Sequence, residues 1–348
     1  MTASRGLRLA LALALGLAAV AAAVAVSCAL GPQPISFRAA LGGVDPDAAI
    51  LLGLRLPRAL LAALVGAALA AAGTALQALL RNPLAEPFVL GVSGGAALGG
   101  SLVLVASAGL AALLGPVGQV LGSAPPVAAG AIAGAAASTV LVFGLGRIDG
   151  RLVPEAALLV GIVFNAFAAG VITLVKMLVP PEQASRLLYW LLGAVGYESA
   201  GTIALGGALI ALSVGALVVL SARLNLLTLG DEEAASLGLD VRRARAWIFF
   251  AASAATGAAV ALAGMVGFVG LIVPHLVRRL VGPDHRLLVP ASALFGAAFL
   301  TLADALARLA FLPLGTEPPV GAVTAFLGGP FFLWLLRRSA RPGPEAAP

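Results

Sequence analysis

Charged residues are scarce in this sequence. Asp, Glu, Lys and Arg make up only 10% of its 348 residues, whereas a soluble domain contains about 25%. Hydrophobic residues make up 61% of the chain, and the mean hydropathy is +1.08. No water-soluble fold needs so many apolar side chains over this length. The composition therefore excludes a soluble protein and predicts an integral membrane protein.

Lysine, histidine and cysteine are almost absent as well. The only lysine, Lys176, is not part of the Gly-x-x-x-x-Gly-Lys-Ser/Thr loop that binds nucleotide phosphates. ATP hydrolysis would therefore have to be supplied by another chain. Cys28 is the only cysteine, which excludes a disulfide framework and a thiolate metal cluster. The two histidines, His275 and His285, lack the spacing of a paired metal site. We expect no metal, no cofactor and no catalytic site.

The net charge of +6 does not indicate a nucleic-acid-binding protein. The arginines lie in short gaps between apolar runs, and no basic stripe runs beside stacking aromatic residues. Arginines in such gaps are typical of loops that are retained on the cytoplasmic side of a membrane.

Ten apolar segments are candidates for membrane-spanning helices, which need about 20 residues each. They cover residues 9–30, 58–80, 88–106, 126–145, 156–178, 199–222, 244–264, 268–281, 288–308 and 319–336. With the N-terminus inside, fifteen of the 21 Lys and Arg residues lie on the cytoplasmic side and six lie outside. We therefore predict an all-α membrane protein with ten transmembrane helices and cytoplasmic N- and C-termini. Its single domain covers residues 1–348, of which 9–338 are membrane-embedded and 339–348 form a flexible cytoplasmic tail.

The first segment could instead be a signal peptide, with Ser27 and Cys28 as a poor lipoprotein cleavage site. Its apolar run, residues 9–26, is longer than the roughly 7–15 residues of a signal-peptide core. The length favours a retained first transmembrane helix.

Residues 180–193 form an amphipathic segment that is too short to cross a membrane. Pro180, Pro181 and Glu182 are typical of a helix start, and Gly193 is typical of a helix end. About a dozen residues suit an interfacial or re-entrant helix. The alternative is a plain extracellular loop.

The gap between the sixth and seventh segments has the pattern of a short cytoplasmic helix. Gly230 and Gly238 bracket about two helical turns, and Asp231, Glu232 and Glu233 occupy the first turn, where they oppose the helix dipole. Another protein could bind a short, rigid helix between two spans and transmit a movement through it to those spans. The alternative is a solvated turn.

Further motifs lie at residues 77–87, 91–96, 267–279 and 282–286, and include Arg81-Asn82-Pro83 and Pro274-His275. Together with residues 229–239 they resemble the FecCD family of ABC importer permeases, from about residue 55 to residue 338. Members carry ferric siderophores, haem or cobalamin across bacterial inner membranes. The resemblance implies a multi-pass inner-membrane protein of the type II ABC importer permease architecture.

The resemblance also implies the partners. They are a second copy of the chain, two ATP-binding-cassette ATPase subunits that use the ATP, a periplasmic substrate-binding protein and the lipid bilayer, with no nucleic acid. We expect a ferric siderophore as cargo, with cobalamin or haem as alternatives. A self-sufficient, ion-coupled secondary transporter is the rival class, but Asp304 is the only acid placed well inside a span.

Site residues follow from the resemblance. The ATPase-coupling helix would comprise Leu229, Gly230, Asp231, Glu232, Ala234, Leu237 and Gly238. Arg55, Arg58 and Arg308 would dock acidic residues of the binding protein, although Arg58 and Arg308 could also snorkel from helix ends. The cytoplasmic gate would comprise Leu152, Val153, Pro154 and Glu155. The pathway, between the fifth and tenth spans of the dimer, would be lined by Phe164 and Asn165.

Two isolated residues have simpler explanations than a functional role. Asp304 lies four residues before Arg308, the spacing of a helical salt bridge. A proton relay is the second explanation for Asp304. For His275 we expect a packed position in a helix rather than haem ligation.

Overall fold

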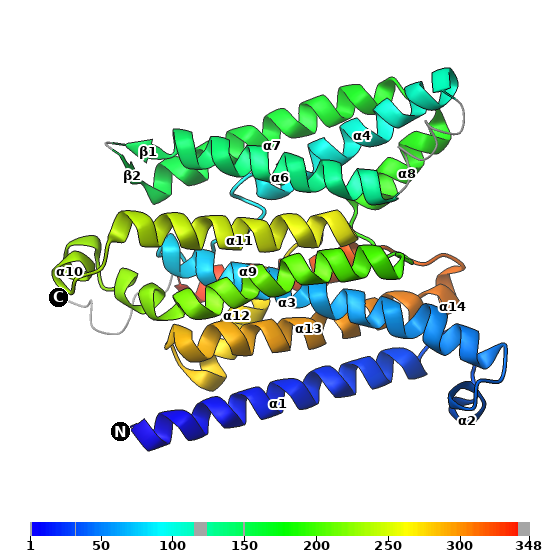
Figure 1. The fold of residues 1–348 in the computed structure, drawn as a ribbon, viewed down its shortest axis with the longest axis horizontal. Helices are drawn as coiled ribbons and strands as arrows, with labels where there is room; N and C mark the ends of the chain where they lie inside the picture. Colours follow the sequence, from blue (N-terminus) through cyan, green and yellow to red (C-terminus); the bar gives the residue numbers. More distant parts are fainter. Residues whose placement is uncertain (1, 32, 115–123, 149, 340–348) are drawn as a thin grey trace.

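The computed structural model describes residues 2–31, 33–114, 124–148 and 150–339. The predicted tail lies, except for its first residue, outside this part of the chain. Long helices run side by side along one axis of an elongated molecule (Figure 1). Each of the ten predicted segments overlaps one of them. They are α1 (Thr2–Ala29), α3 (Leu56–Leu79), α4 (Val92–Leu114), α6 (Ala124–Leu145), α7 (Pro154–Met177), α9 (Ala200–Leu227), α11 (Val241–Ala263), α12 (Val269–Val281), α13 (His285–Leu309) and α15 (Val320–Ser339).

Eight helices in the described part are long and apolar enough to cross a membrane. Helix α12, with 13 residues, is shorter than that criterion requires, and α4 carries no charged residue from Val92 to Leu114. The chain is therefore a multi-pass helical membrane protein.

Short elements gather at the two ends of the bundle. They are α2 (Phe37–Leu41), the π-helix η1 (Ala49–Arg55), α8 (Pro181–Leu191), α10 (Asp231–Ser236), α14 (Phe311–Leu314), β1 (Arg147–Ile148) and β2 (Arg151–Leu152). In Figure 1 the N-terminus, α10 and the strands lie at the left end, whereas α2, α8 and α14 lie at the right end. In the described part of the chain, a short antiparallel ribbon, in which β1 pairs with β2, stands where we expected a loop, and the fold is otherwise helical.

Proline and glycine set several helix boundaries. Helix α4 begins at Val92 and not at residue 88, because Gly91 adopts a left-handed φ of 81°. Helix α8 has Pro181 in its first turn and is followed by Gly193 at φ 76°, which confirms the predicted short helix.

Helix α3 is the centre of the bundle, and small residues let its neighbours approach closely. A Cβ on Gly73 would lie 2.0 Å from the carbonyl oxygen of Gly270 in α12, and one on Gly66 would lie 2.2 Å from that of Gly296 in α13. Such contacts are typical of helix packing in lipid. There the hydrophobic effect does not drive helices to associate, because lipid tails are as apolar as the side chains, and close packing contributes instead.

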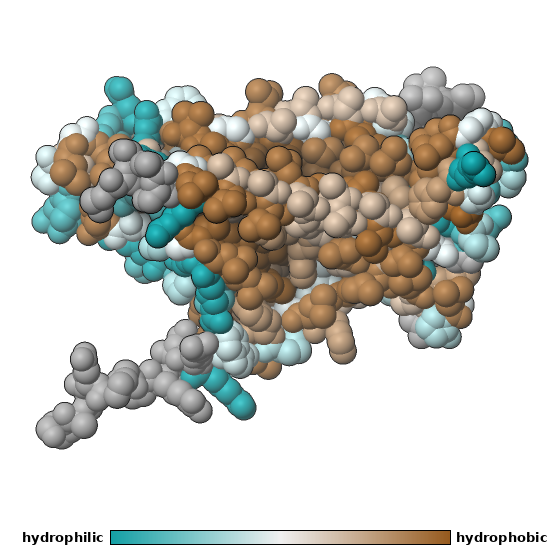
Figure 2. All heavy atoms as spheres, turned by 90° about the horizontal axis from the view of Figure 1, so that it is seen from below, coloured by the Kyte–Doolittle hydropathy of each residue, from teal (hydrophilic) through white to brown (hydrophobic). Residues whose placement is uncertain are grey.

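The outer helices present an apolar surface. Helices α1 and α7 are mostly exposed along their apolar lengths, whereas α3 is mostly buried. Figure 2 shows a hydrophobic band across the middle of the molecule, with hydrophilic residues concentrated towards both ends. This distribution fits a chain whose middle lies in hydrocarbon.

Candidate functional site

Helix α10 is held at its ends by the two glycines that the sequence analysis singled out. Gly230 has a φ of 137° and Gly238 a φ of 84°, conformations that favour glycine. All three acids lie in the first turn. Ala234 is buried, while Leu229 and Leu237 are 59% and 61% exposed. The helix therefore presents two apolar side chains outward from a capped, anchored turn.

Asp231, the first residue of α10, accepts bonds from two arginines on other segments. Arg81, in the turn after α3, approaches its carboxylate to 2.5 Å, and Arg245 of α11 approaches it to 2.8 Å. Arg81 also donates from Nε to the carbonyl of Leu227 at 3.1 Å. These contacts tie α10 to α3, α9 and α11, and sequence analysis identified none of them.

The predicted gate residues lie at the hairpin and the start of α7. The hairpin pairs Arg147 with Leu152, and the Leu152 side chain is buried. Val153 is the N-cap residue of α7, Pro154 occupies its first turn, and Glu155 is exposed. Proline suits this position because the first turn of a helix offers no acceptor for a backbone N–H, so a residue without an N–H loses no hydrogen bond there.

Arg245 connects the hairpin to α10. Its Nη1 donates to the carbonyl oxygen of Leu152 at 2.7 Å, while its Nη2 bonds Asp231. The Arg245 side chain is buried. One guanidinium thus joins the candidate coupling helix to the candidate gate.

The predicted pathway residues, Phe164 and Asn165, are half-buried and contact the start of α4 and the turn before it. The amide of Asn165 donates to the carbonyl of Phe88 at 2.7 Å, and its oxygen lies against Gly94. The Phe164 ring lies against Gly91. The exposed face of α7 consists instead of Leu159, Ile162, Val163 and Phe167. The i, i+4 spacing of 159, 163 and 167 was the available signal, but the whole helix is apolar and does not distinguish its faces.

All three arginines proposed for docking lie at the end of the bundle that carries α8 and α14, but they have partners within the chain. Each is only 5–6% exposed. Arg58 forms an ion pair with Asp304 at 2.8 Å and also bonds Glu317. Arg55 donates to the carbonyls of Cys28 at 2.9 Å, Ala29 at 3.3 Å and Gln33.

Arg308 and Asp304 form the expected i, i+4 salt bridge, at 3.3 Å. Arg308 also donates to the carbonyl of Ser27 at 2.9 Å, which ties α13 to the end of α1. Because Arg58 and Arg308 point into the subunit, the snorkelling interpretation does not describe either residue in this structure.

Glu317 links this charge cluster to α8. Its backbone carbonyl accepts a bond from the Tyr189 hydroxyl at 3.3 Å, and the Arg58 guanidinium lies over the Tyr197 ring at 5.4 Å. Burial, and then the charge of the Glu317 carboxylate, raise the pKa of the Tyr189 phenol, which therefore remains a donor.

Glu86 is a half-buried acid whose role sequence analysis missed. Its carboxylate accepts a bond from the backbone N–H of Phe268, a residue with a left-handed φ of 68°. Nearby, the Gln77 side chain donates to the carbonyl of Gly270 at 3.1 Å. The segments 77–87 and 267–279, both singled out as motifs, therefore meet in space.

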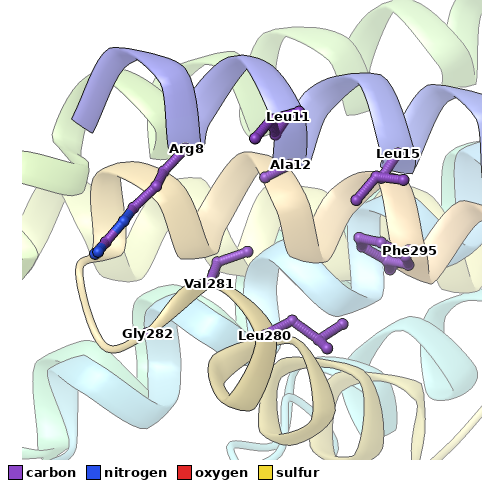
Figure 3. Close-up of a pocket in the computed structure, with 8 residues that line it drawn as sticks. All are labelled: Arg8, Leu11, Ala12, Leu15, Leu280, Val281, Gly282 and Phe295. Atoms are coloured by element: carbon purple, nitrogen blue, oxygen red, sulfur yellow. The ribbon is translucent and has the colours of Figure 1, made fainter. Parts of the chain in front are cut away.

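His275 lies edge-on to the Phe331 ring, with centroids 5.7 Å apart, as expected for a packed residue. A separate surface cavity of about 420 Å³ lies between α1, α12 and α13 (Figure 3). Arg8 is the one charged residue of its lining, and the other side chains are apolar. The cavity offers no pair of polar groups that could perform chemistry.

Comparisons with known proteins agree with this arrangement. A family model, the FecCD transport family, matches residues 9–338. The hemin transport system permease protein HmuU of Yersinia pestis is 42% identical over 316 residues, which cover 90% of this chain and 91% of that protein. The cobalamin import system permease protein BtuC of Halobacterium salinarum is 40% identical, over 85% of this chain and 75% of that protein.

Another relative is the Fe(3+)-citrate import system permease protein YfmD of Bacillus subtilis. It is 38% identical over 83% of this chain and 81% of its own length. A solved metal-chelate-type ABC transporter in an inward-facing conformation matches with a TM-score of 0.80 and 27% identity, over 95% of this chain and 99% of that chain. With a family model that spans nearly all of its helices and relatives this similar over most of their length, the chain belongs to the FecCD transport family.

Proposed function

We propose that this chain is the membrane-spanning subunit of an ATP-binding-cassette importer in the inner membrane. The observation that carries the proposal is α10, a short helix that is flanked by two exposed leucines, Leu229 and Leu237, and anchored through Asp231 to Arg81 and Arg245. Such a helix can fit a groove of an ATPase subunit and transmit its movement. The residues of this coupling helix are Leu229, Gly230, Asp231, Glu232, Ala234, Leu237 and Gly238.

The architecture that we propose has ten spans and cytoplasmic termini. Eight helices meet the requirement of length and hydropathy, and α4 and α12 would complete the set. The N-terminus and α10 lie at the same end of the bundle (Figure 1), as this topology requires.

Two copies of the chain would assemble with two ATPase subunits. The exposed apolar face of α7 supports a second copy, as do Phe326 and Leu333 of α15, which are also exposed. The pathway would run between the copies, near Phe164 and Asn165. Leu152, Val153, Pro154 and Glu155 would close its cytoplasmic end.

A periplasmic binding protein would dock at the opposite end, through Arg55, Arg58 and Arg308. These guanidiniums already bond carbonyls and carboxylates within the chain. When the binding protein docks, its carboxylates would therefore have to replace some of these partners. Glu317 is the least buried member of the cluster, with a side chain that is 31% exposed. A carboxylate of the binding protein would therefore replace Glu317 at Arg58 most readily.

For the cargo we propose an iron chelate, a ferric siderophore, with cobalamin or haem as the alternatives. Relatives named for hemin, cobalamin and ferric citrate support this class. An ion-coupled secondary transporter has less support, because Asp304 is paired with Arg58 and Arg308 and offers no free carboxylate for an ion.

Reconstitution in liposomes tests the proposal. The purified chain alone should not hydrolyse ATP, whereas its complex with the partner ATPase should hydrolyse ATP and import cargo from the binding protein. Hydrolysis by the chain alone would contradict the assignment. Import that is driven by an ion gradient without the ATPase would favour the secondary transporter.

A further inference from the structure

Three cytoplasmic segments of this chain converge on a single pair of side chains, Asp231 and Arg245. Asp231 is the first residue of α10, and Arg245 lies one turn inside α11. The third segment is the hairpin, whose last residue, Leu152, offers its backbone carbonyl to Arg245. Nothing in the amino-acid sequence relates residues 152 and 245, so the convergence is a property of the fold.

We propose that Arg245 is a positioning residue that couples α10 mechanically to the cytoplasmic gate. The proposal rests on the proposed function, in which α10 receives the movement of an ATPase. The guanidinium bonds Asp231 at 2.8 Å through Nη2 and Leu152 at 2.7 Å through Nη1. One guanidinium nitrogen bonds the hairpin and the other bonds α10. A displacement of α10 relative to α11 would therefore move the guanidinium, and with it the hairpin.

The chemistry of arginine suits this role. Its guanidinium is planar, always charged and carries donors in a fixed fork, so two acceptors in different directions can be held at once. Both bonds are charge-assisted, which makes them stronger than bonds between neutral groups. A lysine at the same position would keep the positive charge but provide a single point of contact.

Leu152 passes the movement on to α7. The carbonyl that Arg245 holds lies two residues before Pro154, where α7 begins, and the Val153 N–H closes the hairpin by donating to Gly146 at 3.0 Å. The Leu152 side chain is buried in the core. The hairpin is therefore fixed to α6, α7 and Arg245.

Arg81 provides a comparison within the same cluster. It bonds the same carboxylate of Asp231, and within the described residues its other hydrogen bond goes to the carbonyl of Leu227, at the end of α9. Loss of Arg81 would loosen α10 but leave the contact between α10 and the hairpin intact. The relay that we propose thus depends on one of the two arginines at Asp231.

The test compares Arg245→Lys with Arg81→Gln and Arg243→Gln in the complex with the ATPase. Arg243 is the matched control, since it lies in the same helix, is 81% exposed and pairs with Asp240 in its own turn. Three quantities are measured: ATP hydrolysis, import, and the distance between spin labels on the two copies of an Ile148→Cys, Cys28→Ser chain. Ile148 is an exposed residue of the hairpin.

We expect the Arg245→Lys complex to assemble and to hydrolyse ATP, because α10 keeps its exposed face and Arg81 still holds Asp231. Import should fall by about 5–150-fold, the range of typical coupling between two sites. The change of the Ile148 distance with nucleotide should be lost. Arg243→Gln and Arg81→Gln should keep that change.

Two outcomes would overturn the proposal. One is a wild-type change of the Ile148 distance in Arg245→Lys. The other is a folded Arg245→Lys dimer that no longer binds the ATPase, because Arg245 would then only support the shape of α10. If Arg245→Lys fails to fold, Arg245→Gln, which keeps a single amide donor and leaves the pair of Asp231 with Arg81 in place, decides instead: hydrolysis without the distance change supports the relay, and an unaltered distance change refutes it. Hydrolysis and import by the unmutated complex establish beforehand whether the proposed function itself holds.

Discussion

Arg58 of α3 and Asp304 of α13 form a buried ion pair, 2.8 Å apart, between positions separated by 246 residues. Arg308 approaches the same carboxylate to 3.3 Å, and Glu317 bonds Arg58 from the exposed side. Two cations and two anions therefore meet where α1, α3, α13 and the segment before α15 come together. A charge that is buried there without its partner would destabilise the folded chain.

Asp304→Asn should destabilise the purified chain substantially. Removal of one partner from a buried pair costs about 3–5 kcal/mol, because the other charge remains buried without compensation. The midpoint of thermal unfolding in detergent measures the effect.

Asp240→Asn is the control for this prediction. Asp240 caps α11 and pairs with an exposed Arg243, and asparagine caps a helix equally well. That exposed pair should contribute no more than about 1 kcal/mol. Equal midpoints for the two variants would refute the structural role of Asp304.

Gly73→Ala should destabilise the bundle by about 1–3 kcal/mol, the usual cost of an overpacked core. The added methyl group would meet the backbone of Gly270, which cannot move aside without shifting α12. Gly215→Ala in α9 is the matched control, because a Cβ there meets no atom within 4 Å. Thermal unfolding of both variants should show a loss for Gly73→Ala and almost no change for Gly215→Ala.

Leu237→Asp should abolish ATPase binding and import together, while membrane insertion and dimerisation remain normal. The side chain is exposed, so its replacement leaves the folded subunit intact. An apolar interface anchor typically contributes about 2 kcal/mol or more, which corresponds to roughly a 30-fold loss of affinity. Co-purification with the ATPase measures the loss, and Leu237→Met should retain most of the binding. Full import by Leu237→Asp would show that α10 has no mechanical role.

Gly230→Val should damage the same interface by a different route. Gly230 has a φ of 137°, a backbone conformation that a residue with a side chain rarely adopts. Helix α10 would have to change its start, so ATPase binding should fall. Gly53→Val, where a Cβ meets nothing within 4 Å, is the control that should bind normally.

Glu317→Gln should strengthen docking of the binding protein, because Arg58 would lose its exposed carboxylate partner but keep Asp304. Binding should be measured by surface plasmon resonance at several salt concentrations, since screening weakens attraction between exposed charges. Charge reversal at Arg58 is a poorer test, because it would also leave Asp304 buried and unpaired. If Glu317→Gln leaves the affinity for the binding protein unchanged at low salt, Arg58 does not take part in docking.

Single cysteines in a Cys28→Ser chain test the topology. A cysteine at Gly150, in the hairpin, should react with an impermeant reagent only from the cytoplasm, and one at Glu182, in α8, only from the periplasm. The two sites lie at opposite ends of the bundle (Figure 1). Labelling of both from the same side would contradict the ten-span topology.

Features that depend on neighbouring residues in the chain could be predicted from the sequence. The scarcity of charge and the apolar runs determined the membrane class, and Gly230 and Gly238 bracketed α10 because both adopt left-handed conformations. Prolines and Gly193 likewise marked α8. The spacing of Asp304 and Arg308 predicted their salt bridge, since residues four apart lie on one face of a helix.

Contacts between distant helices were decided only by the tertiary structure. The pairing of Arg58 with Asp304 and the link from Arg245 to Leu152 depend on which helix faces meet. In a soluble protein the polar and apolar faces of a helix identify the side that packs. Here lipid is as apolar as the protein interior, so the sequence of α7 does not distinguish the side of Asn165, which packs against α4, from the exposed side of Phe167. Close backbone contacts such as that of Gly73 with Gly270, together with buried polar pairs, select the packing instead, and both exist only once the helices have assembled.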